Sequence, residues 1–380
     1  MVRFAAAASE HPVASHAVGE VIGEVMDRMG TGPDLAVLFV TADHTGVMED
    51  LAHAVDELLA PRVLLGTTAV SVLTGPQEYE ETPVVSLWAG DVGGVEPVRL
   101  DVVESPDGTA VVGMPDEALD AGTLVLLADP FSFPTDQFLD ALGEQYPGLR
   151  AIGGLASAAR GPGGNRLVVG RNVHDNGAVG VLLDDALGID IVVSQGCRPI
   201  GEPFVVTRAE RNVVYELGGQ RALDRLQHLI DTASDDQRHL MAQGLHAGIV
   251  ADEHREQFER GDFLIRTVLG ADRSVGAVAI GDQPPVGAIV QFQVRDAETA
   301  DEDLRHLLSG YDAAGALVFT CNGRGERFFG EPHHDAGLVH AVAGDATAGM
   351  FCAGEIGPIG DRNATHGYTA SVLLFGPDAH

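Results

Sequence analysis

Polar and reactive side chains gather in residues 320–335 and 353–355 of the sequence. Cys321, Asn322 and Arg324 follow one apolar run, and Glu355 follows the next. An arginine guanidinium offers a planar pair of donors to a carboxylate or phosphate, and a glycine lets a ligand approach the backbone. The sequence therefore predicts a site for a small anion or an amino acid, with ten candidate ligand-binding residues: Cys321, Asn322, Gly323, Arg324, His333, His334, Asp335, Gly354, Glu355 and His366.

The segment between these two turns is predicted to be a helix over residues 332–344. The free N–H groups at the start of a helix favour an anionic ligand group. Three residues also have plain structural interpretations. Cys321 suits a small buried side chain at a strand end, Asp335 suits a helix-capping role, and Glu355 could cap a turn.

A nucleophilic set of Cys321, His334 and Asp335 is the alternative to simple binding, and it would make the protein a hydrolase or a transferase. Neighbours in sequence do not establish hydrogen-bond geometry, so no catalytic residue is predicted in the first instance. No metal is expected, because His333 and His334 would face about 100° apart on a helix. No nucleotide or other cofactor is expected either, because both GxGxxG and GxxxxGK[ST] are absent.

Three stretches of the sequence share one order of elements: a strand, a helix and further strands. A β-α-β connection joins parallel strands, so their carboxyl ends meet at one sheet edge, where ligands of open α/β sheets bind. Aligning LLGTTAVS, AIGGLASA and FCAGEIGP makes Thr67, Gly154 and Gly354 equivalent. The repeats comprise strands 35–44, 62–71 and 82–90 with helix 48–60; strands 123–131, 149–159, 166–170 and 177–183 with helix 135–146; and strands 315–325, 347–360 and 366–375 with helix 332–344.

The residues between the second and third repeats follow a different pattern. We expect an α/β protein of two domains, whose mixed sheets are built from repeated strand-helix-strand-strand units. The predicted domains are 1–205, with two repeats, and 206–380, with the third repeat and inserted elements. The intervening elements are strands 189–196, 204–207, 245–251, 263–270, 276–281 and 286–294, and helices 221–230, 234–243 and 300–310.

The composition limits the partners that the protein could have. Acidic residues number 56 against 23 basic residues, all arginine, and the formal net charge is -33. This balance disfavours nucleic acids, and the lack of a long apolar stretch disfavours membrane insertion. The three cysteines are too scattered for a disulfide framework, and the apolar run near the N-terminus is too short for a signal peptide. We therefore expect a cytoplasmic protein.

The chain resembles the FIST family, a module of intracellular signal transduction found in bacterial sensors and in some F-box proteins. The resemblance rests on IGGLASA and GAVGVLL in the first half. In the second half it rests on FLIR (263–266), VRD (294–296), FTCNGRG (319–325), HHD (333–335), AGEIGP (353–358) and HGYT (366–369). The family's GCSTAGE-like turn is here GTTAVS, without its Cys and Glu. The resemblance implies a sensor of small ligands such as amino acids. We expect no F-box and no attached output domain, so the signal would pass to a separate protein.

Overall fold

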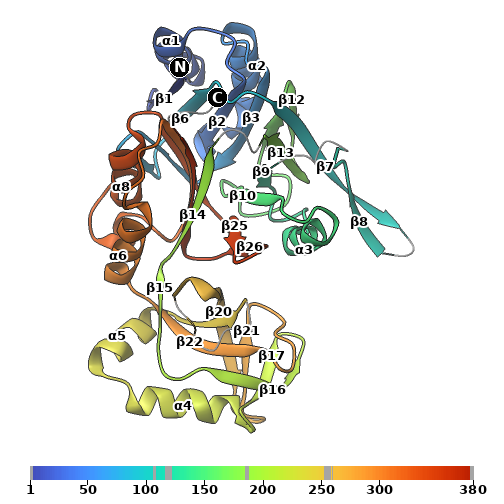
Figure 1. Cartoon of the computed structure of the whole chain (residues 1–380), viewed down its shortest axis with the longest axis vertical. Coiled ribbons are helices and arrows are strands. Elements are labelled where there is room, and N and C mark those ends of the chain that lie inside the picture. Colours follow the sequence, from blue (N-terminus) through green and yellow to red (C-terminus); the bar gives the residue numbers. More distant parts are fainter. Residues whose placement is uncertain are drawn as a thin grey trace. The chain divides into compact units, whose positions relative to one another are not determined.

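The chain divides into two compact units in the computed structural model, which describes residues 3–105, 108–115, 122–184, 188–251, 258 and 260–376. The first unit consists of residues 1–193, 304–365 and 369–380, and the second consists of residues 194–303 and 366–368. The predicted division at residue 205 differs from this arrangement, because the third repeat folds with the first two. Figure 1 labels many of the elements of both units.

The first unit contains three mixed sheets, which begin with the first repeat. Helices α1 and α2 cover the outer face of this sheet through a shared apolar cluster. The sheet has the strand order β1 (Phe4–Ser9), β6 (Val85–Gly90), β2 (Leu35–Thr41), β3 (Val63–Ala69), β11 (Leu167–Val169) and β12 (Asn172–His174), with helices α1 (Ala14–Met29), η1 (Ala42–Val47) and α2 (Met48–Leu58).

The second sheet contains the second repeat, and helix α3 packs on its outer face. Strands β9 and β10 are parallel, and the third repeat contributes two strands to the edge beyond β10. Its order is β26 (Arg362–His366), β25 (Glu355–Ile359), β10 (Arg150–Leu155), β9 (Thr123–Ala128), β13 (Ala178–Leu183), β7 (Val95–Ser105) and β8 (Gly108–Val112), with helix α3 (Thr135–Gln145).

The third sheet contains the third repeat together with a hairpin from the first. Residues of α6 and α8 pack against it in one apolar cluster. Its order is β14 (Ile189–Gln195), β27 (Thr369–Phe375), β23 (Gly315–Cys321), β24 (Thr347–Cys352), β4 (Ser71–Thr74) and β5 (Gln77–Glu80), with helices α6 (Ala297–Leu308), α7 (Glu326–Phe329) and α8 (His334–Ala343).

The second unit contains a largely antiparallel sheet with accompanying helices, drawn from yellow-green to orange in Figure 1. A cluster of buried apolar residues from β17, β21, β22 and α4 forms its core. Its strands are β15 (Cys197–Pro199), β16 (Phe204–Glu210), β17 (Val213–Leu217), β18 (Gln220–Arg221), β19 (Leu245–Val250), β20 (Phe263–Asp272), β21 (Ala277–Ile280) and β22 (Ile289–Arg295), with helices α4 (Ala222–Thr232) and α5 (Asp235–Gln243) and the short helix η4 (Arg260–Asp262).

The three repeats have one topology, which confirms the predicted mixed α/β repeat. In each repeat the two strands joined by a helix are parallel, and the last strand returns antiparallel on the far side of the first. The central orders are β6-β2-β3, β13-β9-β10 and β27-β23-β24. Their inner faces share one apolar core, in which Phe39 and Phe319 meet edge to face at 6.3 Å.

A glycine stands at the same register position in all three parallel pairs. Gly66 lies opposite Leu38, Gly153 opposite Leu126, and Gly349 opposite Val318. A Cβ atom on these glycines would lie 2.7, 1.9 and 2.0 Å from the carbonyl oxygen of the opposite residue. The strands therefore approach too closely for any side chain at these positions. This register corrects the alignment from sequence: Thr67 and Gly154 are equivalent, but their counterpart in the third repeat is Met350 rather than Gly354.

Replacing Gly349 with alanine should lower the free energy of unfolding by about 2 to 3 kcal/mol, because β23 and β24 must separate to admit the methyl group. Gly337→Ala in α8 is the matched control. A Cβ atom there meets nothing within 4 Å, and alanine favours a helix, so stability should be unchanged or slightly higher. Urea unfolding followed by the fluorescence of Trp88, the single buried tryptophan, measures both variants. A Gly349→Ala loss smaller than about 0.5 kcal/mol would contradict this account of the register.

Candidate functional site

The turns that follow β23 and β24 lie side by side, as the predicted β-α-β connection requires. Cys321 and Cys352 are opposite each other at the ends of these parallel strands, and the Asn322 N–H donates to the Cys352 carbonyl oxygen at 2.9 Å. Helix α8 links the strands and begins at His334 rather than at the predicted residue 332. The polar residues of both turns and of the helix start therefore share one edge of the sheet.

A buried ion pair connects this edge to the start of α8. The Arg324 Nε and Nη2 atoms donate to Asp335 Oδ2 and Oδ1 at 2.8 and 2.9 Å, and the Thr320 hydroxyl donates to Oδ2 at 2.6 Å. Burial opposes ionisation of Asp335, but the Arg324 charge and these hydrogen bonds outweigh it, so the pKa of this carboxyl lies well below its usual range. Both side chains are essentially inaccessible to solvent.

This ion pair changes the role that the sequence suggested for Arg324. The planar fork was predicted to receive a carboxylate or phosphate of a ligand, but it is already engaged by Asp335. A ligand could reach the fork only by displacing that carboxylate from a buried position, which is costly. Arg324 therefore connects the turn after β23 to the start of α8 instead of facing a ligand. Its guanidinium lies 5.1 Å from the centre of the Phe329 ring.

Glu355 is a fully buried carboxyl group beside Cys321. Its Oε2 atom accepts from the Thr369 N–H and hydroxyl at 3.1 and 2.9 Å, while Oε1 has no partner of normal hydrogen-bond geometry among the described residues. Burial raises the pKa of Glu355 to about 8, against the opposing effects of Thr369, the nearby Cys321 thiol and the Arg324 charge. Glu355 is therefore mostly protonated at neutral pH.

The two histidines at the start of α8 point to different neighbours. His333 is exposed, adopts a left-handed backbone conformation with φ 63°, and accepts a hydrogen bond from the Glu78 N–H at its Nδ1 atom, at 3.0 Å. His334 is buried, stacks on the Phe329 ring and places Nδ1 3.0 Å from Asp335 Oδ1. They do not converge on one point, and no group of His, Cys, Asp or Glu side chains among the described residues is arranged to hold a metal ion.

The anion position at the start of α8 is filled by the protein itself. Glu78 of β5 accepts the Ala336 N–H at Oε1, at 3.0 Å, so a carboxylate occupies the place predicted for an anionic ligand group. Burial is the main reason that the pKa of Glu78 rises to about 7, and the charges of Asp335 and Glu80 add to the effect. Sequence reasoning did not select Glu78.

The remaining candidates lie in different settings. Asn322 is exposed and Gly323 is half-buried, and the Gly323 N–H approaches the Cys321 sulfur at 3.5 Å. Gly354 is buried, and a Cβ atom there would lie 3.0 Å from Leu155. His366 is buried in the second compact unit. His334 and Asp335 contact each other, whereas the Cys321 thiol approaches Asn322 and Gly323 and lies near Glu355. The proposed nucleophilic set stays a prediction.

A pocket of about 420 Å³ opens beside the start of α8. It is bordered by the hairpin strand β5 and by Pro332 and His333, and Glu78 lies in its wall. Among the described residues that line it, four of nine are glutamates and none is arginine. The lining residues are Glu10, Gln77, Glu78, Tyr79, Glu80, Thr82, Glu326, Pro332 and His333.

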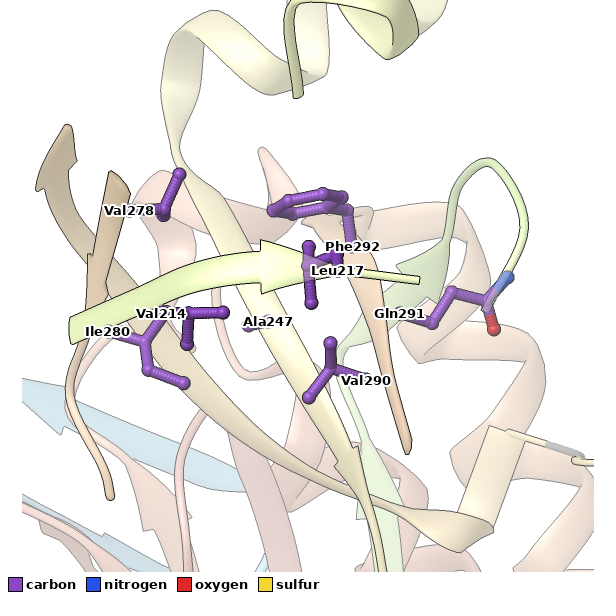
Figure 2. A pocket seen from close by; sticks show the side chains of 8 residues that line it. All are labelled: Val214, Leu217, Ala247, Val278, Ile280, Val290, Gln291 and Phe292. Carbon is purple, nitrogen blue, oxygen red and sulfur yellow. The ribbon is translucent and has the colours of Figure 1, made fainter. Parts of the chain in front are cut away.

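Two other hollows have a different character. A pocket of about 570 Å³ in the first unit is lined in part by Arg150, Asp361 and Arg362. A cavity of about 10 Å³ in the second unit is enclosed mostly by apolar side chains that converge in Figure 2, whereas the Gln291 amide donates to the Gly201 carbonyl. It has room for about one water molecule, so it does not suit an organic ligand.

Sequence comparison adds the relationship to known proteins. A model of the FIST N domain matches residues 34–220, and a model of the FIST C domain matches residues 222–358. The chain belongs to the FIST family. Two similar relatives are the uncharacterized protein Rv0628c of Mycobacterium tuberculosis strain H37Rv, 41% identical over 382 residues covering 98% of this chain and 100% of the relative, and the uncharacterized protein Mb0898c of Mycobacterium bovis, 41% identical over 375 residues covering 97% of each.

FIST domains are associated with signal-transduction sensors. The two FIST domain models meet near residue 221, but the compact units do not divide there, because residues 304–365 return to the first unit. The candidate edge of this FIST protein is built from β23, β24 and α8, whereas the pocket wall comes largely from the β4–β5 hairpin. None of its helices, within the part of the chain that the structure describes, has the length and apolar character needed to cross a membrane.

Proposed function

We propose that this FIST protein senses a small polar ligand, and that the ligand occupies the 420 Å³ pocket beside the start of α8. The volume lies within the range of small-molecule sites, about 300 to 1,000 Å³. The pocket borders the edge where the sequence predicts ligand binding, and His333 belongs to both. The proposed ligand-binding residues are therefore Glu78 and His333. The ion pair of Arg324 and Asp335 supports them by holding the start of α8 in place.

Two hydrogen bonds connect Glu78 to the start of α8, and they are the main support for the proposal. The Glu78 carboxylate accepts the Ala336 N–H, and the Glu78 N–H donates to the His333 ring, each at 3.0 Å. A group that binds Glu78 thus acts on two bonds that hold the first turn of the helix. The same turn carries Asp335, so the response can reach Arg324 and the end of β23. Ligand binding can produce a signal only if the ligand favours one conformation of this helix start over another.

Signalling also needs a recipient, and we propose a separate output protein. The start of α8 is the element that would report the ligand, since Glu331, Pro332 and His333 are exposed beside the pocket. An amino acid stays within the proposal because its ammonium group suits the acidic lining. A simple carboxylate has less support at this pocket, because the Arg324 fork is engaged by Asp335.

Thermal-shift screening of the full chain against amino acids, small carboxylates and small amines tests the proposal. A true ligand stabilises the folded state, by about 2.7 kcal/mol at one hundred times its Kd, so it should raise Tm. The rise should persist in the exposed-surface control Glu144→Gln and be lost in Glu78→Gln. Hydrogen exchange should slow at the amides of residues 333–337 and stay constant in α3. Failure of every compound to raise Tm, or an equal rise in Glu78→Gln, would overturn the proposal.

A further inference from the structure

One residue that lines this pocket has a buried acceptor atom with no hydrogen-bond donor among the described residues. Glu78 is 6% exposed, and its Oε2 atom has no hydrogen-bond partner among the described residues, while Oε1 is engaged by Ala336. A buried carboxylate oxygen without a donor costs free energy, and such atoms in folded proteins are normally satisfied by a ligand, an ion or water. Glu78 is one of the residues that line the pocket, and its Oε2 atom is closed to solvent in this conformation, so a donor from the pocket reaches it when the side chain shifts.

The surrounding charges restrict which donor fits. Glu10, Glu80 and Glu326 line the same pocket, and of the lining residues that the structure describes, His333 alone has a side chain able to carry a positive charge. One Glu80 oxygen is already engaged, because Oε1 accepts the Glu326 N–H at 2.8 Å. Carboxylates grouped around a concave, partly buried surface attract cations and repel anions.

We propose that the pocket binds a small organic cation with a primary ammonium group, which donates a hydrogen bond to Glu78 Oε2. The assignment rests on the proposed function, since it names the chemical class of the ligand at the same site. An ammonium group supplies three donors, so it can serve Glu78 and a second oxygen of the lining together. Neither a neutral alcohol nor a carboxylate of the same length can offset the negative charge of the lining.

Binding of such a cation should release a proton from the protein. Glu78 is faced by Glu80 on its own strand, by Asp335 and His334 of α8, by His333, and by Glu326 and Glu10 across the pocket. With a pKa of about 7, close to half of the Glu78 carboxyls are protonated at pH 7 in the free protein. The ammonium group favours the ionised form and lowers that pKa. About half a proton should therefore leave per cation bound at pH 7, and close to a full proton at pH 6.

Titration calorimetry of the full chain with n-butylamine, n-butanol and butyrate, three probes of similar length, tests the assignment. We expect saturable binding of butylamine alone, with a heat that depends on the ionisation enthalpy of the buffer at pH 6 and loses most of this dependence at pH 8. Glu78→Gln should weaken binding about tenfold or more, because it removes a charge-assisted hydrogen bond. Its amide oxygen can still accept the Ala336 N–H, so the fold should persist. Glu144→Gln should bind as the wild type does.

The outcomes separate this assignment from the proposed function. If butanol or butyrate binds and Glu78→Gln abolishes that binding, the pocket is a ligand site but the cationic class is wrong. If butylamine binds equally well to Glu78→Gln, or if none of the three probes binds, the assignment is overturned. Butylamine binding that releases no proton at pH 6 would show that the ammonium group does not contact Glu78.

Discussion

Replacing Asp335 with alanine should lower the free energy of unfolding by about 3 to 5 kcal/mol, because it removes the carboxylate that compensates the buried Arg324 charge. Arg324 and Asp335 are 0% and 1% exposed and joined by two hydrogen bonds, so solvent cannot compensate the loss. Urea unfolding monitored by Trp88 fluorescence measures the effect within the first unit. The pKa of Asp335 is depressed in the folded state, so this stabilisation should be present above about pH 4 and decline as the pH falls further.

The matched control is Asp345→Ala, which removes an exposed partner of His340 and should cost less than about 1 kcal/mol. The double variant Arg324→Met, Asp335→Leu should recover much of the loss, because apolar side chains of similar size need no charge compensation. A loss below about 1 kcal/mol in Asp335→Ala would show that the ion pair does not hold the edge together.

Glu355→Gln should make the protein more stable than the wild type at pH 9, by about 1 to 3 kcal/mol, and change little at pH 5. The folded-state pKa of Glu355 is raised to about 8, so folding favours its protonated form. Its contribution is full below about pH 4.5 and is lost as the pH rises through 8. Glutamine is neutral at every pH and can still accept the hydrogen bonds of Thr369, so it removes this loss.

The measurement is the free energy of unfolding at pH 5, 7 and 9 for the wild type, Glu355→Gln and Glu144→Gln. Glu78 also has a raised pKa, of about 7, so Glu355→Gln should reduce the pH dependence rather than abolish it. Combining it with Glu78→Gln should flatten the curve further. Parallel curves for the wild type and Glu355→Gln between pH 5 and 9 would mean that Glu355 ionises normally in the folded protein.

Local patterns predicted the elements that surround the candidate edge. The helix expected at 135–146 occurs as Thr135–Gln145, and the strand expected at 123–131 ends at Ala128. Helix α1 was missed, although Val18, Val21, Ile22 and Val25 repeat at helical spacing and are buried. The signal was present in that case, because an apolar stripe of this kind requires no knowledge of distant residues.

Long-range pairing explains what the sequence could not provide. Glu78 lies in a four-residue polar strand, and it reaches α8 only because β4 pairs with β24, for example Leu73 with Gly349. Nothing near Glu78 in the sequence indicates a partner more than 250 residues away. A different limitation affected Arg324: Asp335 is only 11 residues away and was also selected, but the sequence does not show that the two side chains pair with each other.

The return of residues 304–365 and 369–375 to the first unit has a consequence for synthesis of the chain. Phe319 and Phe375 contribute to the core shared by the three sheets, and β4 finds its partner in β24. A nascent chain that ends near residue 220 would expose much of that apolar core, so it should depend on chaperones or aggregate. Pairing across such separations also slows folding. Residues as far as Phe375 must therefore be synthesised before the larger unit can close.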